Sequence, residues 1–326
     1  MILMTNIQPK VSVIIPVYNR AGYIPPVLAS LQSQTFHEFE AIIVDDGSID
    51  HLEELIPKNL DWIKIIHQEH RGPGPARNRG IHIAAGEYLV FLDVDDAILP
   101  EKLERQSHYL DGHPEISLVY SNGYLVKTKD DGTEERILLS SAGLLQFKLG
   151  TPEENIRALS VTNVFPIHTA MVRKQAVLDA NGFDESEEMY VLEDWDLWFR
   201  IGEKHQFAFE DIPTIEYNVD EGGISKNKLL MLKASVSMEK KIASSVGFST
   251  LSPGLQARSH LAFGILALKF GDPNLARGRF LKAIKKNPLN PIAWAAYSLT
   301  LFGKENSIRY FNYFREKFVT RGQLHL

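Results

Sequence analysis

Three aspartates lie within four residues of the segment FLDVDDAILP, at Asp93, Asp95 and Asp96, directly after the apolar run YLVFL. Carboxylates this close repel one another, and each raises the pKa of its neighbours unless a cation, hydrogen-bond donors or open water relieve the charge. A positive group is therefore expected beside this segment.

Strand and helix patterns alternate over residues 11–100, and they place this segment at the end of a strand. Short β-branched and apolar runs predict buried strands, and stretches with helical spacing predict the helices between them. The predicted strands are VSVIIPVY (11–18), FEAIIVDDGSID (39–50, running into acidic and turn residues), IKIIHQEH (63–70) and GEYLVFLDVDDAILP (86–100), and the predicted helices are 21–34, 51–60 and 71–85.

Alternating strands and helices of this kind predict a doubly wound α/β sheet, which binds its ligands at the carboxyl ends of the strands. Three polar clusters fall at those ends: VYNR, DDGS and DVDD. We therefore expect the three clusters to form one site.

Five motifs, in this order and with these spacings, resemble a family 2 glycosyltransferase: IIPVYNR, VDDGSID, GPARNRG, FLDVDD and EDWDLWFR. The resemblance covers residues 10–230 and implies the GT-A fold, a doubly wound mixed sheet. It also implies an inverting, metal-dependent enzyme that moves a sugar from a nucleoside diphosphate sugar, of UDP or dTDP type, to an acceptor hydroxyl. Glycan or surface polysaccharide synthesis is the expected setting.

The resemblance identifies DVDD as the DxD metal motif of this family, with Mn²⁺ or Mg²⁺ as the cofactor. It implies Asp95 as a metal ligand and Asp93 as a second ligand that also contacts the sugar or ribose. Successive side chains of an extended segment alternate sides, so Asp93 and Asp95 should face one ligand while Asp96 points elsewhere. Capping of the following helix is the alternative role for Asp96.

The same resemblance implies a set of residues that contact the nucleotide sugar. Alternatives stay open for several of them. One of the two DDGS carboxylates could serve the turn, and Tyr18 could stack on the base or have a packing role. Arg77 could pair with Asp46 or reach phosphate, and His168 could be structural. Asn78 is expected to bond across strand ends. The set is Pro16, Val17, Tyr18, Asn19, Asp45, Asp46, Arg77, Asn78, Asp93 and His168.

LEDWDLWFRIGEK (192–204) predicts a helix with an apolar face. Carboxylates at its start are favoured by the helix dipole, which is a sufficient structural explanation for them. The family resemblance implies more: Asp194 as the general base that deprotonates the acceptor, Glu193 as a residue that orients it, and Asp196 in reserve.

One departure from the family concerns the loop after the next strand, where many relatives carry a basic residue. This chain has Asn218 and Asp220 there, and Lys226 or Lys228 on a Gly-containing lid are the candidates for the diphosphate contact.

Composition bounds the remaining possibilities. The chain has no cysteine, which excludes disulfides and thiolate metal sites. We expect neither a signal peptide in the first residues nor a stretch that spans a bilayer. We expect a cytoplasmic enzyme with peripheral contact at the inner face of the membrane, and no nucleic-acid partner.

The C-terminal part differs from the rest. Residues 251–326 carry twelve Lys or Arg against three acidic residues, whereas the first 250 residues carry 23 basic against 38 acidic. ARSHLAFGILALKFGDPNLARGRFLKAIKKNPLNPIAW resembles a tetratricopeptide repeat. We predict a catalytic domain over residues 1–230, a helical linker over 231–250 and a helical region over 251–326. That region could contact membrane, a lipid-linked acceptor, a protein partner or a second copy.

Two other classes of protein fit part of the pattern. A haloacid dehalogenase-like phosphatase also carries an apolar strand followed by DxD, but it places Thr or Val where Asp96 stands and opens its domain with the motif. A catalytically silent glycosyltransferase-like module would present the helical repeat to a partner. Retention of both DVDD and the Glu193 and Asp194 pair argues against it.

Overall fold

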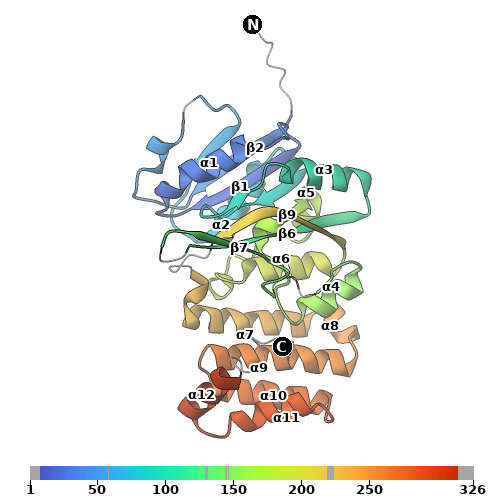
Figure 1. Cartoon of the computed structure of the whole chain (residues 1–326). Helices are drawn as coiled ribbons and strands as arrows, with labels where there is room; N and C mark the ends of the chain where they lie inside the picture. The colour runs from blue at the N-terminus through green and yellow to red at the C-terminus, as the bar shows by residue number, and fades with distance from the viewer. Residues whose placement is uncertain are drawn as a thin grey trace. The chain divides into compact units, whose positions relative to one another are not determined.

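The fold divides into two compact units (Figure 1). A computed structural model describes residues 8–57, 59–128, 131–143, 145, 147–218 and 224–314. Unit 1 comprises Met1–Asn155, Asn163–Glu185 and Asp196–Gly222, and unit 2 comprises Ile156–Thr162, Ser186–Trp195 and Gly223–Leu326. The domain boundaries at residues 230 and 250 stay a prediction, and the helix α7 (Lys228–Ser244) runs across the first of them.

The first half of unit 1 has the alternation that the sequence predicts. The strands β1 (Val11–Val17), β2 (Phe39–Asp45), β3 (Ile63–His67) and β4 (Tyr88–Phe91) are parallel, in the order β3-β2-β1-β4. Both faces of β1 are buried. Val13 and Ile15 belong to the core cluster that includes the helix α1 (Ile24–Gln32). Ile14, on the other face, lies against Gly80 of α2 (Pro73–Ile83).

One predicted helix, over residues 51–60, is wrong in length. Only a 3-10 turn, Leu52–Leu55, forms there. Pro57 explains the difference, because the residue before a proline is pushed out of the helical region. Ile56 accordingly has an extended backbone, with φ −100° and ψ 118°.

The second half of unit 1 completes a mixed sheet, which confirms the predicted fold class. Nine strands of the described residues form one sheet, and the long strands β6 (Ile116–Thr128) and β9 (Gln206–Asn218) pair in parallel. The other members are β5 (Ala97–Ile98), β7 (Glu134–Leu138) and β8 (Ala170–Arg173). The unit's remaining helices include α3 (Lys102–Gly112), α5 (Lys174–Asp179) and the 3-10 turn η3 (Ile167–Thr169). The strands β6 and β7 were not predicted from the sequence.

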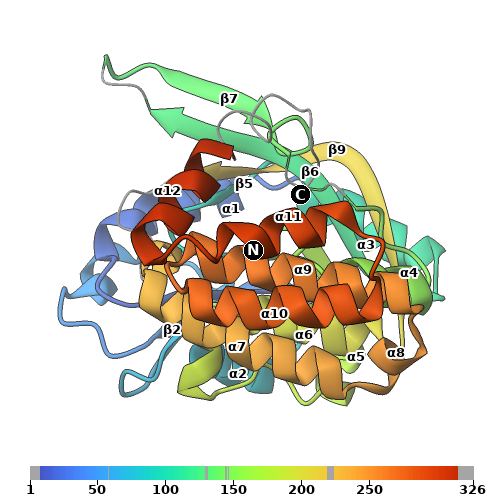
Figure 2. The same cartoon turned by 90° about the horizontal axis from the view of Figure 1, so that it is seen from below.

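Unit 2 is helical, as the sequence predicts. Asn227, Ser252, Asp272 and Asn290 each cap a helix with the side chain, and proline occupies the first turn of three of these helices. Figure 2 shows α9, α10 and α11 side by side. The helices after α7 are α8 (Val246–Thr250), α9 (Pro253–Lys269), α10 (Pro273–Lys286), α11 (Pro291–Leu299) and α12 (Lys304–Phe314), while α4 (Pro152–Leu159) and α6 (Glu193–Gly202) span the boundary between the units.

The pair α9 and α10 packs through a glycine, as expected for a tetratricopeptide-like hairpin. A Cβ at Gly264 would meet the ring of Phe280 at 2.3 Å, and Phe280 is fully buried. Only a residue without a side chain allows this approach. Within the described ranges, none of the helices combines the length and hydrophobicity needed to span a membrane.

Gly264→Ala should destabilise the protein by about 1–3 kcal/mol, because the new methyl group overpacks the contact with Phe280. Gly278→Ala is the matched control, since a methyl group on that helical glycine would have no atom within 4 Å and should gain about 1 kcal/mol of helix propensity. Urea denaturation measures both. Equal effects of the two substitutions would contradict the packing argument.

Candidate functional site

The candidate site lies where three strands of unit 1 end. Because β1 pairs in parallel with β2 and with β4, the carboxyl ends of these strands share one edge of the sheet. The segments VYNR, DDGS and DVDD follow the three strands at that edge. The structure thus brings together the clusters that the sequence analysis expected to meet.

Asp46 holds the loop between β3 and α2. Its carboxylate is 2% exposed and accepts hydrogen bonds from the backbone N–H of Arg71 and of Gly72, at 2.9 and 2.8 Å, and from Nε2 of Gln68 at 2.7 Å. Nδ1 of His70 lies 2.8 Å from its Oδ2. These donors give Asp46 the structural role that the sequence analysis left open for one of the pair.

Asp45 closes the DDGS turn. Its Oδ1 accepts the N–H of Ser48 at 2.9 Å, and its Oδ2 lies 2.9 Å from Nδ1 of His67. Burial alone would raise the pKa of Asp45, but the hydrogen bonds from Ser48 and His67 outweigh it and lower the pKa. Asp45 is therefore an ionised acceptor at the edge, and its contact with a base stays a prediction.

Tyr18 forms an aromatic surface with a residue that the sequence analysis did not single out. Its ring stacks on His70, with centroids 3.7 Å apart and an interplanar angle of 18°, and 44% of Tyr18 is exposed. His70 follows β3, whose carboxyl end lies at the same edge, and this was the signal that could have identified it. Asn19 joins β1 to the DDGS turn, because it accepts the N–H of Ile49 and donates its own to Ser48. Pro16 and Val17 lie inside β1.

Arg77 pairs with the DVDD segment. Its Nη2 lies 2.6 Å from Oδ1 of Asp93, and the guanidinium stands 5.4 Å from the ring centroid of Phe183. The Arg77 side chain is buried whereas that of Asp93 is half-exposed. The positive group expected beside the three aspartates is thus in part Arg77. Its contact with Asp46 or with phosphate stays a prediction.

Asn78 supports a turn rather than a strand end. It accepts the N–H of Phe183 and donates to the carbonyl of Phe183 and to Glu185, at 2.8, 2.9 and 2.9 Å. A Cβ on Gly182 would lie 2.5 Å from its Oδ1. Both N–H groups of the Asn78 amide are used in the GFDE turn, and its contact with a nucleotide sugar stays a prediction.

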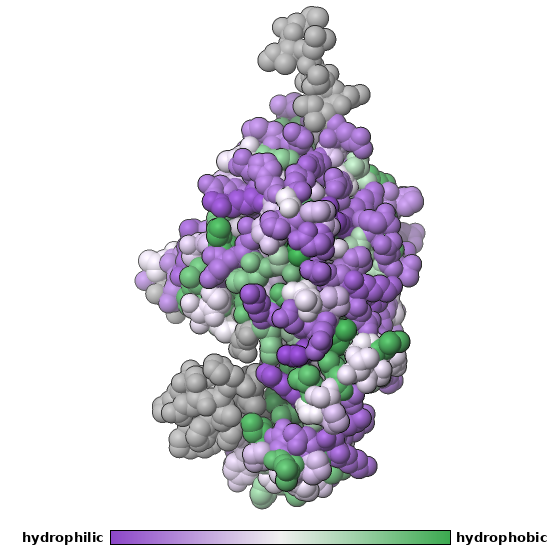
Figure 3. All heavy atoms as spheres, turned by 90° about the vertical axis from the view of Figure 1, so that its right-hand side faces the viewer, coloured by the Kyte–Doolittle hydropathy of each residue, from purple (hydrophilic) through white to green (hydrophobic). Residues whose placement is uncertain are grey.

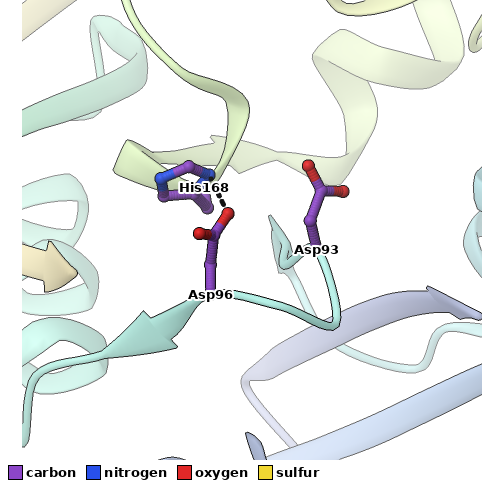
Figure 4. A group of neighbouring side chains, drawn as sticks. All are labelled: Asp93, Asp96 and His168. Carbon is purple, nitrogen blue, oxygen red and sulfur yellow. Dashed lines mark ion pairs between the residues drawn. The ribbon is translucent and has the colours of Figure 1, made fainter. Parts of the chain in front are cut away.

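Asp93, Asp96 and His168 form the candidate metal site (Figure 4). One ligand atom from each lies within 4.8 Å of the other two, and Nδ1 of His168 is 3.1 Å from Oδ2 of Asp96. His168 is buried in η3, and neither ring nitrogen makes a hydrogen bond of good geometry to the described residues. Orphaned buried nitrogens beside two carboxylates suit a divalent cation such as Mn²⁺, which accepts both kinds of ligand.

This grouping differs from the expectation that Asp93 and Asp95 face one ligand. The chain leaves β4 at Phe91 and turns, with the N–H of Asp96 bonded to the carbonyl of Asp93. A turn brings residues three apart to one side, whereas the alternation of sides holds only for an extended strand. Asp95 is not in the group, although it stays a predicted ligand.

Asn218, at the end of β9, fixes this turn. Its N–H donates to Oδ1 of Asp96 at 2.9 Å, and its side chain donates to the carbonyl of Asp95 at 2.7 Å. Asn218, which stands where many relatives carry a basic residue, therefore bonds to the DVDD segment. Asp220 lies outside the described residues, and Lys226 and Lys228 belong to unit 2.

The charge states at the cluster follow from burial. Desolvation, and then the charges of Asp93 and Asp95, raise the pKa of Asp96 well above its usual value. Burial lowers the pKa of His168 to about 4, so the imidazole is neutral and able to bind a metal at pH 7. A cation would relieve the repulsion among the carboxylates.

Lys102 supports the segment that carries His168. This fully buried lysine donates from Nζ to the carbonyl of Thr169 at 3.0 Å and to Gln106 at 2.7 Å, and Gln106 donates to the same carbonyl. Burial lowers the pKa of Lys102 to about 7. The sequence did not identify this role of Lys102, because a buried lysine in an amphipathic helix gives no signal in the sequence.

The residues of α6 are placed as follows. Glu193 and Asp194 open the helix in unit 2, and their role in catalysis stays a prediction. Asp196, the reserve base, is buried and bound through Oδ2 by Nε and Nη2 of Arg200, at 2.8 and 2.6 Å, which is a structural role. The predicted apolar face is confirmed, because Trp195, Trp198, Phe199 and Ile201 are all buried.

Comparison with known proteins bears on this site. Residues 12–180 match the sequence model of a family described as glycosyl transferase family 2. The putative glycosyltransferase EpsH of Bacillus subtilis is 40% identical over 127 residues, 38% of this chain and 36% of EpsH. An uncharacterized glycosyltransferase of Haemophilus influenzae is 32% identical over 177 residues, 52% of this chain and 64% of that protein. One of Rickettsia conorii is 40% identical over 125 residues, 38% of this chain but only 20% of its own length.

Two solved structures share the fold. TarS of S. aureus, residues 1–349 in complex with UDP-GlcNAc, has a TM-score of 0.56 and 20% identity, with 97% of this chain and 93% of that chain covered. The mannosyltransferase PcManGT of Pyrobaculum calidifontis, in complex with GDP-Man and Mn²⁺, has a TM-score of 0.60 and 18% identity, with 93% and 85% covered. At these identities the likeness concerns the fold alone.

Acid should destabilise the metal-free protein through His168. The pKa of this histidine is about 4 in the folded state and 6.5 in a model peptide, so its contribution to stability is present above pH 6.5 and is lost as the pH falls towards 4. In EDTA, the wild type should lose about 3 kcal/mol relative to His168→Gln over this range. Urea denaturation at each pH measures the difference.

The exposed His82, changed to Gln, is the control for this measurement. Parallel stability curves for wild type and His168→Gln between pH 6.5 and 4 would contradict the burial of a neutral imidazole.

Proposed function

The chain belongs to glycosyl transferase family 2, and we propose that it is a metal-dependent, inverting glycosyltransferase that uses a nucleoside diphosphate sugar. The observation that carries this proposal is the group Asp93, Asp96 and His168 at the carboxyl edge of the sheet, beside the DDGS turn. A hexosyltransferase is the subclass we propose, with a role in glycan or surface polysaccharide synthesis.

The donor site is proposed along the edge formed by β1, β2 and β4. Asp45 is an ionised acceptor for the imide N–H of uracil or thymine, and Tyr18 with His70 offers a flat surface for the base. UDP and dTDP sugars are favoured on this ground. Among fold neighbours, TarS binds UDP-GlcNAc and PcManGT binds GDP-Man, so either base class suits the fold.

Mn²⁺ or Mg²⁺ is the proposed cofactor, held by Asp93, Asp96 and His168, with Asp95 as the further ligand predicted from the sequence. When bound, it would neutralise the charge that develops on the leaving diphosphate. Arg77 keeps the Asp93 carboxylate in place through its 2.6 Å contact, and Asn218 does the same for Asp96. These partners restrict the ligands before a donor arrives.

Asp194 is the proposed general base, and Glu193 is proposed to orient the acceptor. In a single displacement the acceptor oxygen forms a bond to the anomeric carbon, the bond from that carbon to the diphosphate oxygen breaks, and Asp194 takes the hydroxyl proton. Attack from the face opposite the leaving group inverts the anomeric centre. Asp194 already accepts the N–H of Trp195 at 2.7 Å through Oδ1, which fixes the carboxylate plane.

The acceptor is proposed to be a glycan or a lipid-linked molecule, reached from the cytoplasmic side of the membrane. Exposed apolar side chains in unit 2, among them Trp294, Leu301 and Phe302, together with the excess of basic residues, support peripheral contact with anionic lipid. Figure 3 shows hydrophobic residues at the surface of the helical part, between hydrophilic ones. Association with a protein partner or a second copy through these helices is the alternative.

A catalytically silent module is the second candidate for the function, because unit 2 could present its helices to a partner. The burial of Asp96 beside Asp93 and Asp95 speaks against it, because this arrangement raises the pKa of Asp96 and a protein without a cation to bind gains nothing from that cost. A phosphatase of the haloacid dehalogenase type is disfavoured by membership of family 2.

Donor binding should stabilise the protein. The Tm is measured by thermal denaturation in the presence of UDP, dTDP, GDP or CDP, each once with added Mn²⁺ and once with added EDTA. One of the nucleotides should raise the Tm by several degrees when Mn²⁺ is present. The reason is that a ligand at a hundred times its Kd adds about 2.7 kcal/mol to the stability of the folded protein. Asp96→Asn and Asp93→Asn should abolish the shift. Asp96→Asn should also raise the Tm in EDTA, because an amide cannot ionise and so avoids the burial penalty that raises the pKa of Asp96.

Asp61→Asn, an exposed carboxylate at the opposite end of β3, is the control. Loss of the shift in Asp95→Asn and Asp93→Asn, but not in Asp96→Asn, would favour the ligand set predicted from the sequence. The absence of a shift with all four nucleotides would overturn the donor site.

Asp194→Asn should reduce sugar transfer about 10²–10⁴-fold while the Mn²⁺-dependent nucleotide shift stays unchanged, because the substitution removes only proton abstraction. Release of the nucleoside diphosphate, measured over a panel of glycan and lipid-linked acceptors, gives the rate. Glu193→Gln should affect the KM for the acceptor more than kcat. Asp196→Asn should instead lower stability through the lost pair with Arg200. Full activity of Asp194→Asn would exclude it as the base.

A further inference from the structure

A cavity lies within unit 2. It has a volume of about 560 Å³, within the range of small-molecule sites. The start of α7, the turn between α9 and α10, and the turn between α11 and α12 surround it. Its lining includes Lys228, Leu232, Phe270, Arg277, Thr300 and Lys304.

The side chains that line this cavity carry a net positive charge. Lys228, Arg277 and Lys304 line it, against the single carboxylate of Asp272. Asp272 is occupied as the cap of α10, where its Oδ1 accepts the N–H of Leu275 at 2.9 Å. Across the described part of the chain, none of the three cations forms an ion pair with a carboxylate.

Elsewhere in unit 2 the basic residues behave differently. Arg279, on the same helix as Arg277, lies 2.6 Å from Glu239, and Lys282 lies 3.8 Å from the same carboxylate. The buried Arg279 is thus paired against α7, whereas the three cations around the cavity form no ion pair among the described residues. Three like charges facing one space favour an anion within it.

The geometry of Arg277 leaves donors for such an anion. Its Nε donates to Oγ1 of Thr300 at 3.2 Å and its Nη2 to the carbonyl of Thr300, which holds the guanidinium against the end of α11. Two of its five N–H donors are used there, so three remain. A fixed guanidinium suits the oxygens of a phosphate.

The backbone adds to the same charge. Helices α7, α10 and α12 begin at Lys228, Pro273 and Lys304, all of which line the cavity. The first turn of a helix carries a partial positive charge. Asn227 and Asp272 take up N–H groups of α7 and α10, so the backbone adds its charge there more than free donors. Gly303, before α12, has no side chain that could cap that helix.

We propose that this cavity binds a phosphate-bearing ligand, a phosphomonoester or a diphosphate. The three basic side chains exceed the single carboxylate by two charges, which matches a divalent group better than a carboxylate. Leu229, Leu232 and Phe270 supply an apolar wall for the part of the ligand that carries the phosphate. That ligand is either a phospholipid headgroup or a soluble phosphate compound.

Inorganic pyrophosphate is the probe, titrated into the whole chain by calorimetry in EDTA, which suppresses metal-dependent binding at Asp93 and Asp96. Lys304→Gln alone should weaken binding, and the double variant Lys228→Gln/Lys304→Gln should weaken it at least tenfold. The effect of Lys304→Gln distinguishes this cavity from the donor site, because Lys228 is also a predicted contact of the donor diphosphate. The control Lys285→Gln/Lys286→Gln, which removes the same charge from the last turn of α10, should bind as the wild type does. No binding to the wild type, or equal loss in both double variants, would overturn the proposal.

Vesicles distinguish the two sources of phosphate. Sedimentation with phosphatidic acid vesicles but not with phosphatidylcholine vesicles, lost in Lys228→Gln/Lys304→Gln and competed by pyrophosphate, would identify the lipid headgroup. Pyrophosphate binding without sedimentation would identify a soluble phosphate compound. Sedimentation that is weakened equally by Lys285→Gln/Lys286→Gln would show a diffuse basic surface and contradict a site in the cavity. None of these outcomes depends on glycosyl transfer.

Discussion

The parallel pairing of β1 with β2 on one side and β4 on the other is the constraint on which the site depends. Parallel strands end at the same edge, so three polar segments far apart in the chain meet there. Both faces of β1 are buried, so most of its residues are apolar and the polar segment VYNR follows at its end. The carboxyl ends of the strands are therefore where these carboxylates meet.

Placing several carboxylates close together costs stability, because they repel one another. The structure limits this cost in a different way for each aspartate. Asp46 is satisfied by loop donors and Asp93 by Arg77, whereas Asp96 is buried beside His168 with a raised pKa. Strongly perturbed groups of this kind cluster at functional sites. Asp96 and His168, which are the least satisfied of these residues without a ligand, are thus among those proposed to bind the cation.

Unit 2 differs from unit 1 in the sign of the charge that it gathers. Its helices are fixed by side-chain caps and by the contact of Gly264 with Phe280, and its charge is mainly positive. Glu239 accepts Arg279 in the helical core, but the cations around the cavity at the start of α7, α10 and α12 have no carboxylate partner in the described chain. A site for anions in this unit would complement a site for cations in the other.

The sequence by itself determined the alternation of strands and helices, the edge at which VYNR, DDGS and DVDD meet, and the family, because hydrophobic period and motif order are local properties. It also placed the apolar face of α6 and the helical C-terminal part. Only the tertiary structure decided which carboxylates group together. The turn after Phe91 places Asp96, rather than Asp95, beside His168, and Arg77 beside Asp93. The supports at His70, Lys102 and Asn218 come from elements distant in the chain, and such contacts leave no periodic signal.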